Sequence, residues 1–466
     1  MHYYPVIVHT PLVPFGVSYL GAAVGVMITA SHNPAQDNGY KVYWGNGCQI
    51  IPPHDKGIAE SIAQNLRPMR DYVAFADSIT SLSDGAVPWN TQSLKSVQDG
   101  YFQSLGSIVK LSPPTRPFVY TPMHGVGLPY MQKAVGDSKH MVVVKEQAEP
   151  DPEFPTVKFP NPEEKGALDL AMEAAERNNA TIIVATDPDA DRLAVAEKVE
   201  GVWHQFTGNQ LGILLASYIF SVYCKEHSND VSKLSMLATT VSSQMLSHMA
   251  AVEGFHFDET LTGFKWLGNR AIDLERTGYD VQFGFEQAIG YMLPKIAHDK
   301  DGISAATLFL AACAAWDSSE KGSLTPWGQL QTLYKKYGYF ADIDAYVRSP
   351  SPADTTAAFA RIRAFGKPFP AEFAPGQKIL SWRDLTIGYD SREPDNKPRL
   401  PVDPATEMIT VEVEGGVRFT VRGSGTEPKI KLYIEGQGAN FEEARAKADA
   451  VVNILLDVWL PGFPRG

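Results

Sequence analysis

Three aspartates stand at alternate positions in the segment DPDADR (residues 187–192), directly after the apolar run TIIVAT. Carboxylates this close repel one another unless a cation neutralises them, and a set of oxygen ligands favours a hard ion such as Mg²⁺. We therefore predict that Asp187, Asp189 and Asp191 hold Mg²⁺. The alternative is a solvated acidic turn. A calcium-binding EF-hand loop is excluded, because arginine and lysine stand where that loop needs glycine and glutamate.

A serine that could act as a nucleophile or phosphate carrier occurs in the segment TASHNP (residues 29–34), after the strand-like run VGVMI. A serine at the end of a strand is presented to a cleft, and His32 stands beside Ser31. Neighbouring side chains of a strand point to opposite faces, however, so this adjacency is also compatible with a simple turn. The residues alone leave both interpretations open.

The segment RGSGTEPK (residues 422–429) combines two glycines and two hydroxyl side chains with a cation at each end. Backbone amides, hydroxyls and a bidentate arginine can surround a phosphate, whereas a hairpin turn needs little beyond the glycines. The pattern predicts a phosphate-binding loop between two strands. The Walker pattern and a strand-linked GxGxxG are both absent, so nucleotide binding is not predicted.

Two further segments carry polar side chains next to predicted strands. TGFK (residues 262–265) follows an acidic run, and FEQAIGY (residues 285–291) is followed by HDKD (residues 298–301). Taken singly, a glutamate or lysine in such a segment is most often a solvated surface group.

The elements that position these segments follow from the hydrophobic pattern. Strand, helix and strand patterns alternate from residue 117 to residue 253, which predicts α/β units with mixed or parallel sheets. After residue 350 the pattern changes to alternating strands and one amphipathic helix over residues 440–459, which indicates a small α+β domain. We predict four domains, with the limits 1–110, 111–206, 207–345 and 346–466.

Composition and charge exclude several classes of protein. The chain has 466 residues, of which 44% are hydrophobic and 20% charged, so neither disorder nor a membrane protein is indicated. The net charge of −12 argues against nucleic-acid binding and requires any phosphate site to be a local cluster of arginine and lysine. Three cysteines without a CxxC pattern predict neither disulfides nor zinc, so we expect a cytoplasmic protein.

Together and in this order, the motifs TASHNP, DPDADR, TGFKWLG, FEQAIGY and RGSGTEPK resemble those of the α-D-phosphohexomutase superfamily. The resemblance covers nearly the whole chain. Flanking segments such as QDNGYKVYW and SGTEPKIKLY are similar to the eukaryotic phosphopentomutase and phosphoglucomutase-2 branch. This implies an α/β fold in which three similar mixed-sheet α/β domains, the first incomplete, and a C-terminal α+β domain surround a central cleft.

The resemblance also implies roles for individual residues. Ser31 matches the phosphoserine, which lends an oxygen to the Mg²⁺ held by the three aspartates. Lys300 matches a lysine near the transferring phosphate, and the general base is either His32 or Lys300. The implied substrate-binding residues are Arg192, Thr262, Gly263, Glu286, Gln287, Arg422, Ser424, Gly425, Thr426 and Lys429.

The implied activity is an isomerase reaction, an intramolecular phosphoryl transfer between sugar 1-phosphate and 5- or 6-phosphate through a bisphosphorylated sugar. Ribose and glucose phosphates are the expected substrates, and glucose 1,6-bisphosphate or ribose 1,5-bisphosphate the expected activator. We expect a monomer without nucleic-acid or membrane partners. A glucose 1,6-bisphosphate synthase is an alternative within the same chemistry. A DxD phosphatase is disfavoured, because Asp191 stands where that class carries a hydroxyl residue.

Two departures from the family affect these expectations. Ala288 occupies a position where hexose-specific relatives carry serine, and Gln287 replaces a glutamate common in the pentomutase branch. The chain also begins well inside the family's first domain, without its leading strands and N-terminal arginine motif. An inactive, truncated pseudoenzyme is therefore a further alternative.

Overall fold

The computed structural model describes residues 1–67, 90, 92–111, 114–136, 138–318, 324–424 and 428–465. The chain divides into two compact units, which are Met1–Leu237 with Gly263–Trp327 and Ala238–Thr262 with Gly328–Gly466. Within the described residues, no helix is both long and apolar enough to span a bilayer.

The first unit begins with a two-stranded antiparallel sheet that packs against a helix. Ile28 is paired with Tyr40, so the TASHNP segment lies in the connection between the two strands. The strand predicted before Ser31 is therefore present. The elements of this part are α1 (Leu12–Leu20), β1 (Val24–Ile28), β2 (Tyr40–Trp44), α2 (His54–Gln64) and α4 (Ser93–Ile108).

The next sheet of the first unit has the strand order β4-β3-β5-β6-β7. β3 is parallel to β4 and β5, whereas β6 is antiparallel to both β5 and β7, which confirms the predicted mixed sheet. The elements are β3 (Phe118–Thr121), α5 (Leu128–Val135), β4 (Met141–Val143), η1 (Lys145–Gln147), α6 (Asp169–Asn178), β5 (Ile182–Thr186), β6 (Leu193–Val199) and β7 (Val202–Gln205). The acidic DPDADR segment is the loop from β5 to β6.

The third part of the first unit places β10 between β11 and β8. A capping box formed by Thr207 and Gln210 starts its longest helix. The boundary between the two units falls within β8. The elements are α7 (Gly208–Glu226), β8 (Leu234–Thr239), α9 (Phe264–Arg276), β10 (Asp280–Glu286), β11 (Gly290–Met292) and α10 (Gly302–Asp317).

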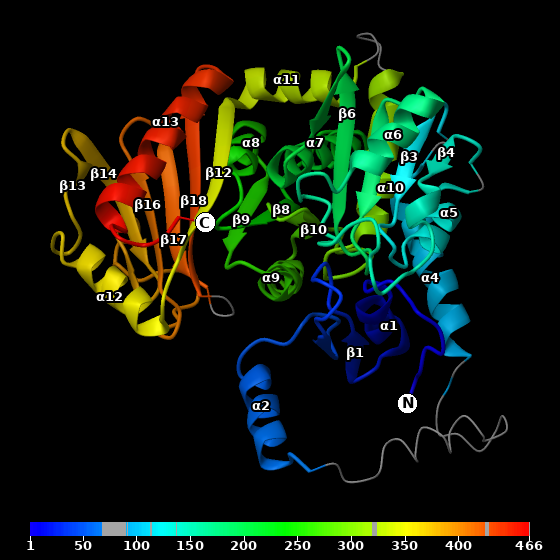
Figure 1. Ribbon diagram of the computed structural model, residues 1–466, viewed down its shortest axis with the longest axis horizontal. Coiled ribbons are helices and arrows are strands. Elements are labelled where there is room, and N and C mark those ends of the chain that lie inside the picture. Colours follow the sequence, from blue (N-terminus) through cyan, green and yellow to red (C-terminus); the bar gives the residue numbers. More distant parts are fainter. Residues whose placement is uncertain are drawn as a thin grey trace. The chain divides into compact units, whose positions relative to one another are not determined.

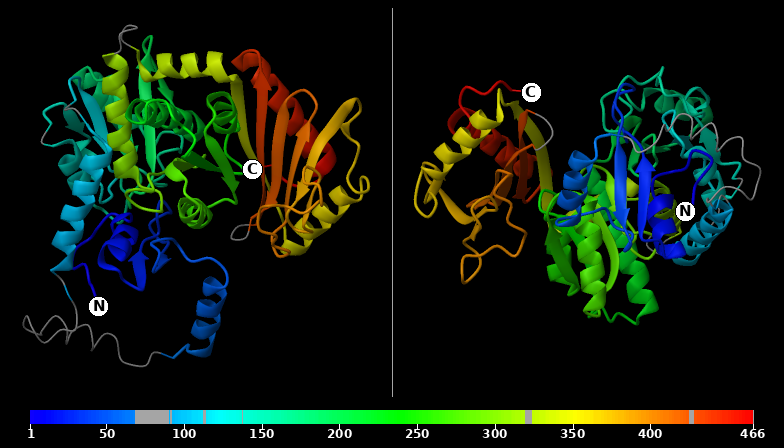
Figure 2. Two further views of the ribbon diagram at one scale, coloured as in Figure 1. Left: turned by 180° about the vertical axis from the view of Figure 1, so that it is seen from behind. Right: turned by 90° about the horizontal axis from the view of Figure 1, so that it is seen from below.

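The second unit is built on a sheet with the strand order β12-β18-β17-β16-β14-β13, and β15 pairs with β14. The helix α13 lies along this sheet (Figures 1 and 2) and contacts β18 and β12. The elements are α8 (Met245–Glu253), β9 (His256–Thr260), α11 (Pro326–Tyr337), β12 (Tyr339–Arg348), α12 (Pro352–Arg363), β13 (Glu372–Ala374), β14 (Gln377–Asp384), β15 (Tyr389–Asp390), β16 (Met408–Val413), β17 (Val417–Gly423), β18 (Lys429–Gly438), α13 (Phe441–Ile454) and η2 (Leu455–Trp459).

The final helix differs from the prediction. One amphipathic helix was expected over residues 440–459, but α13 ends at Ile454 and a π-helical turn, η2, follows. Leu455 and Trp459 are both buried in the core of the second unit, and Arg361 donates a hydrogen bond to the Trp459 carbonyl at 2.8 Å. Core packing, rather than helix periodicity, therefore decides how the helix ends.

Candidate active site

The three aspartates of the acidic loop are all buried. One carboxylate oxygen from each can be chosen so that the three atoms lie within 4.8 Å of one another. The Oδ2 atom of Asp187 and the Oδ1 atoms of Asp189 and Asp191 are buried and accept no hydrogen bond from any described residue. A buried carboxylate oxygen without a partner is strongly unfavourable. The three oxygens therefore fit a bound cation.

The charges around the loop lead to the same conclusion. Burial, followed by the neighbouring charges of Asp189 and Asp191, raises the pKa of Asp187 well above its usual range. Burial also acts to raise the pKa of Asp189, but Lys41 and Lys300 outweigh it and hold that pKa below its usual range. Arg192, whose Nε atom lies 4.0 Å from Asp187 Oδ2, offsets the rise in the pKa of Asp187 only in part, and a divalent metal ion held by the three carboxylates would supply further positive charge.

Two lysines from other elements contact the same loop. The Nζ atom of Lys41, in β2, lies 2.9 Å from Asp189 Oδ2 and 2.5 Å from Asp191 Oδ2. The Nζ atom of Lys300 lies 2.6 Å from Asp191 Oδ2. Lys300 was predicted from the family resemblance, whereas Lys41 was missed. The available signal was that Lys41 is the single charged residue of β2, the strand that follows the serine segment.

Two threonines that were also missed tie the serine segment to the acidic loop. The hydroxyls of Thr10 and Thr29 donate hydrogen bonds to Asp189 Oδ2 at 2.7 and 3.0 Å, and the Thr10 N–H donates to the Asp189 carbonyl at 2.9 Å. Thr29 in turn accepts a hydrogen bond of 2.8 Å from the Ser31 N–H. This contact helps to hold Ser31 in the left-handed conformation, with φ at 57°, which is uncommon for residues other than glycine.

His32 lies between Ser31 and Arg192. Its Nδ1 atom is 3.2 Å from Ser31 Oγ, and its Nε2 atom is 3.4 Å from Arg192 Nη1. A guanidinium group only donates, so Nε2 accepts and the ring proton lies on Nδ1, from which it is donated to Ser31 Oγ. Burial, followed by the charge of Arg192, lowers the pKa of His32 to about 3, so the ring stays neutral. In this tautomer no lone pair of His32 faces the serine.

Lys300 is positioned by the start of α10. The Asp301 carboxylate caps this helix by accepting hydrogen bonds from the Ile303 and Ser304 N–H groups at 3.0 and 3.1 Å, and it accepts another from the Tyr101 hydroxyl at 2.7 Å. At Gly302, a Cβ atom would lie 2.3 Å from the carbonyl oxygen of Arg192. Glycine therefore allows the helix start, and Lys300 before it, to approach the acidic loop.

The predicted sugar-binding residues of the first unit also lie together. Glu286, the last residue of β10, accepts a hydrogen bond of 3.1 Å from the N–H of Gly263, the N-cap residue of α9. Gln287 and Ala288 follow in the turn between β10 and β11. A Cβ atom at Gly208 would lie 1.8 Å from the Gln287 carbonyl oxygen, so the absence of a side chain there lets α7 pack against this turn.

The remaining predicted residues belong to the second unit. Arg422 donates a hydrogen bond of 2.5 Å from its Nη1 atom to the hydroxyl of Thr262. The Ser424 N–H donates to the Lys429 carbonyl at 2.9 Å, which closes the base of the glycine-rich loop. The Nζ atom of Lys429 lies 4.5 Å from the centre of the Tyr346 ring. Gly425 and Thr426 lie outside the described residues.

We expect Arg422→Ala to raise the KM for a sugar phosphate by an amount equivalent to about 1.5–3 kcal/mol, the range for a hydrogen bond to a charged group. Steady-state kinetics measure this change. Arg445→Ala is the matched control, because Arg445 is half exposed and, among the described residues, pairs only with Asp449 on α13. An unchanged KM, or an equal change in the control, would contradict the phosphate-binding role of Arg422.

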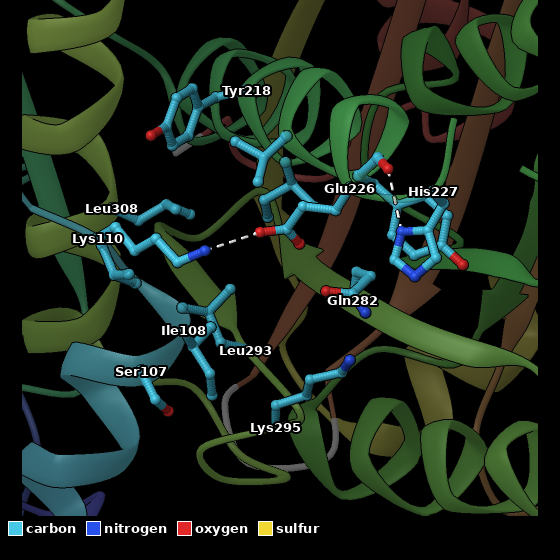
Figure 3. A pocket seen from close by; sticks show the side chains of 14 residues that line it. Ser107, Ile108, Lys110, Tyr218, Glu226, His227, Gln282, Leu293, Lys295 and Leu308 are labelled. Atoms are coloured by element: carbon cyan, nitrogen blue, oxygen red, sulfur yellow. Dashed lines mark hydrogen bonds and ion pairs between the residues drawn. The ribbon is translucent and has the colours of Figure 1, made fainter. Parts of the chain in front are cut away.

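A separate pocket of about 260 Å³ lies in the first unit between α4, α7 and α10 (Figure 3). Its two lysines are already paired with carboxylates: Lys110 with Glu226 at 3.0 Å and Lys295 with Asp280 at 2.9 Å. None of the predicted site residues lines it. The pocket is thus poorly suited to a phosphate, and the candidate site of the first unit is the acidic loop.

Four family models match the chain. The α/β/α domains I, II and III of phosphoglucomutase/phosphomannomutase match residues 2–68, 99–201 and 207–337, and the C-terminal domain of the same family matches residues 389–453. The match confirms the predicted order of three α/β domains followed by a C-terminal domain.

Individual relatives match almost the whole chain. The phosphoribomutase of Saccharomyces cerevisiae is 47% identical over 478 residues, which cover 97% of this chain and 76% of the relative. Human glucose 1,6-bisphosphate synthase is 42% identical over 468 residues, which cover 98% and 74%. The crystal structure of a putative phosphomannomutase from Thermus thermophilus has a TM-score of 0.63 at 20% identity, with 97% and 83% covered, and so shares the fold.

Proposed function

Because the chain belongs to the phosphoglucomutase/phosphomannomutase family and is thus a sugar phosphomutase, an isomerase, we propose that it interconverts ribose 1-phosphate and ribose 5-phosphate and also acts on glucose 1-phosphate. One observation carries the proposal. The three buried aspartates, each with an oxygen that accepts no hydrogen bond from the described residues, are linked through Thr29 to Ser31. A phosphoryl carrier beside a cation site is the arrangement that such a transfer needs.

In the proposed reaction, phosphorylated Ser31 gives its phosphoryl group to a sugar hydroxyl. The bond from phosphorus to the serine oxygen breaks, a bond to the sugar oxygen forms, and the hydroxyl proton passes to a base. The resulting sugar bisphosphate turns end for end and returns its other phosphoryl group to Ser31. Arg422 and its loop hold the phosphate that is not being transferred.

Residues of the first unit would bind the metal ion, position the serine oxygen and accept the hydroxyl proton. Mg²⁺, held by the three aspartates and an oxygen of Ser31, would neutralise the charge that develops on the serine oxygen. His32 holds that oxygen through its Nδ1 proton. The base is His32 or Lys300: the lone pair of His32 faces Arg192, and Lys300 can accept a proton only after it has released one from its ion pair with Asp191. Arg192, which lies at Nε2 of His32 while Ser31 lies at Nδ1, would bind a phosphate group of the substrate.

The proposal extends to the conditions in which the enzyme works. We propose Mg²⁺ as the ion, a sugar bisphosphate as the activator that phosphorylates Ser31, and a monomer that acts in the cytoplasm. Domain limits of 1–110, 111–206, 207–345 and 346–466 are proposed for the four matched domains. The identity to glucose 1,6-bisphosphate synthase supports a second candidate activity, in which a separate phosphoryl donor converts a sugar monophosphate to a bisphosphate.

We expect ribose 1-phosphate to be converted with a higher kcat/KM than glucose 1-phosphate. Ala288, in the turn after Glu286, offers no hydroxyl to a hexose ring, while Glu286 can accept a hydrogen bond from either sugar. An unpaired polar group in a bound sugar costs about 1–3 kcal/mol, equivalent to roughly ten- to a hundred-fold in discrimination.

Competition between the two substrates in one reaction measures this ratio directly. Ala288→Ser is the matched variant, because it should shift the ratio towards glucose 1-phosphate. A clear preference of the natural chain for glucose 1-phosphate would show that the argument from Ala288 is wrong. Formation of a bisphosphate from a separate phosphoryl donor, without interconversion of monophosphates, would favour the synthase activity.

A further inference from the structure

A buried ion cluster in the second unit joins one carboxylate to two guanidinium groups. The Oε1 atom of Glu259, in β9, lies 2.8 Å from Arg383 Nη2 and 2.6 Å from Arg418 Nη2. The two arginine side chains, from β14 and β17, are only 4% and 9% exposed, and that of Glu259 is 18% exposed. Both guanidinium groups also donate to the hydroxyl of Thr240.

The composition of this cluster is not the one that stability alone would favour. Both guanidinium groups form their ion pair with the single carboxylate of Glu259, although Glu435 is the cross-strand partner of Arg418. The Nε atoms of both arginines and the Nη1 atom of Arg418 are buried without a hydrogen-bond partner among the described residues. Buried ion pairs often contribute less stability than apolar side chains of the same size, because taking the charges out of water is costly. We therefore explain the burial of these charged groups by the position in which they fix the chain segment that carries Glu259.

The cluster holds the segment that leads to the predicted sugar-binding loop. Thr262, three residues after Glu259, accepts the hydrogen bond from Arg422. Between them, Leu261 packs against an apolar group that contains Leu385 and Met408, and Met408 is the cross-strand partner of Arg422. The side-chain contacts of Glu259 and Thr262 are therefore both made with arginines of β14 and β17, while the backbone of the segment is paired with the end of β8 through the Thr260 carbonyl, which accepts from the Thr240 N–H at 2.8 Å.

The distance between the two polar contacts, Glu259 with Arg418 and Thr262 with Arg422, is one that a single short segment can span. Arg418 and Arg422 are four residues apart on β17, so they share a face and are separated by about 13 Å along the strand. The three steps from Glu259 to Thr262 span about 10 Å when extended. The segment thus runs alongside β17 and is fixed by Glu259 at one end and by Thr262 at the other.

We propose that Glu259 is a positioning residue for substrate binding: by anchoring the segment on Arg383 and Arg418, it places the Thr262 hydroxyl against Arg422 and so orients the Arg422 guanidinium towards a sugar phosphate. The inference rests on the proposed phosphate-binding role of Arg422 and adds a residue outside the loop motifs. Glu259 itself touches no ligand in this account.

Titration of the protein with ribose 5-phosphate, followed by calorimetry, tests the inference through binding alone. We expect Glu259→Gln to weaken binding about ten-fold, the scale of one displaced hydrogen bond to a charged group. In an active preparation, the KM should rise by a similar factor while kcat stays nearly unchanged.

The matched control is Glu253→Gln. Glu253 is a second little-exposed carboxylate of the same unit, at 15%, and it contacts Lys336 and Tyr337. Its loss should lower thermal stability without changing the affinity for ribose 5-phosphate. Equal losses of affinity in the two variants, or unchanged affinity in Glu259→Gln, would overturn the positioning role.

A double-mutant cycle with Thr262→Ala separates positioning from general damage. If Glu259 acts through Thr262, Glu259→Gln should weaken binding no further in the Thr262→Ala background, whereas additive losses would overturn the inference. If Glu259→Gln does not fold, Glu259→Asp replaces it and is held to the same two criteria, since it keeps the charge but shortens the side chain. The natural chain could bind ribose 5-phosphate without converting any sugar phosphate. This result would contradict the proposed function, but the affinities of the natural chain and its variants for ribose 5-phosphate would still test the role of Glu259.

Discussion

Ser31→Ala is expected to lower the rate of sugar-phosphate interconversion by about a thousand-fold or more, because it removes the oxygen that carries the phosphoryl group between the two sugar positions. Among the hydrogen bonds of the described residues, the Ser31 hydroxyl contributes only its contact with His32. The thermal stability of the variant should therefore stay close to that of the natural chain. Turnover by a coupled assay and melting by circular dichroism give the two measurements.

Ser107→Ala is a suitable control for this variant. Ser107 lies near the end of α4, where its exposed hydroxyl donates to the carbonyl of Ser104. Its removal should affect neither turnover nor melting. Sustained turnover by Ser31→Ala would contradict the phosphoserine mechanism, whereas loss of turnover together with unfolding would point to a structural role of the serine.

Asp189→Asn is expected to lower turnover by about a hundred-fold and to raise the Mg²⁺ concentration needed for half-maximal activity. The amide has nearly the shape of the carboxylate and can still accept hydrogen bonds from Thr10 and Thr29. What it loses is the negative charge that a divalent ion requires. The fold should persist, because the change removes a charge and leaves no cavity.

Binding of the ion can be measured without turnover, from the increase in melting temperature that Mg²⁺ causes in the natural chain. This increase should be reduced in Asp189→Asn and preserved in Asp169→Asn, because Asp169 is an exposed carboxylate at the start of α6. An unchanged response to Mg²⁺ in Asp189→Asn would exclude Asp189 as a ligand.

The sequence predicts those parts of the fold and site that depend on neighbouring residues. The run TIIVAT forms β5 because a continuous apolar stretch is favoured in a buried strand, and the three aspartates after it lie together because one short loop carries them. The same holds for Ser31, which follows a strand, and for Arg422, which lies at the end of one. In each case the chemistry and its structural context lie within about ten residues.

Contacts between segments that are distant in the sequence cannot be predicted from local sequence patterns. Lys41 meets Asp191 across 150 positions of the sequence, and Glu259 meets Arg418 across 159. In the sequence, a single lysine in a strand or a glutamate near a predicted loop cannot be distinguished from an ordinary surface residue. Only the folded chain distinguishes them, because burial and the identity of the partner depend on how the sheets pack.

The central claim, that Ser31 carries the phosphoryl group, is tested most directly by mass spectrometry of the protein after incubation with glucose 1,6-bisphosphate and Mg²⁺. We predict that the natural chain gains the mass of one phosphoryl group, that fragmentation places it on Ser31, and that a later addition of ribose 5-phosphate removes it. Ser31→Ala should gain no mass. A phosphoryl group on another residue, or a natural chain that stays unmodified while it converts sugar phosphates, would contradict the account.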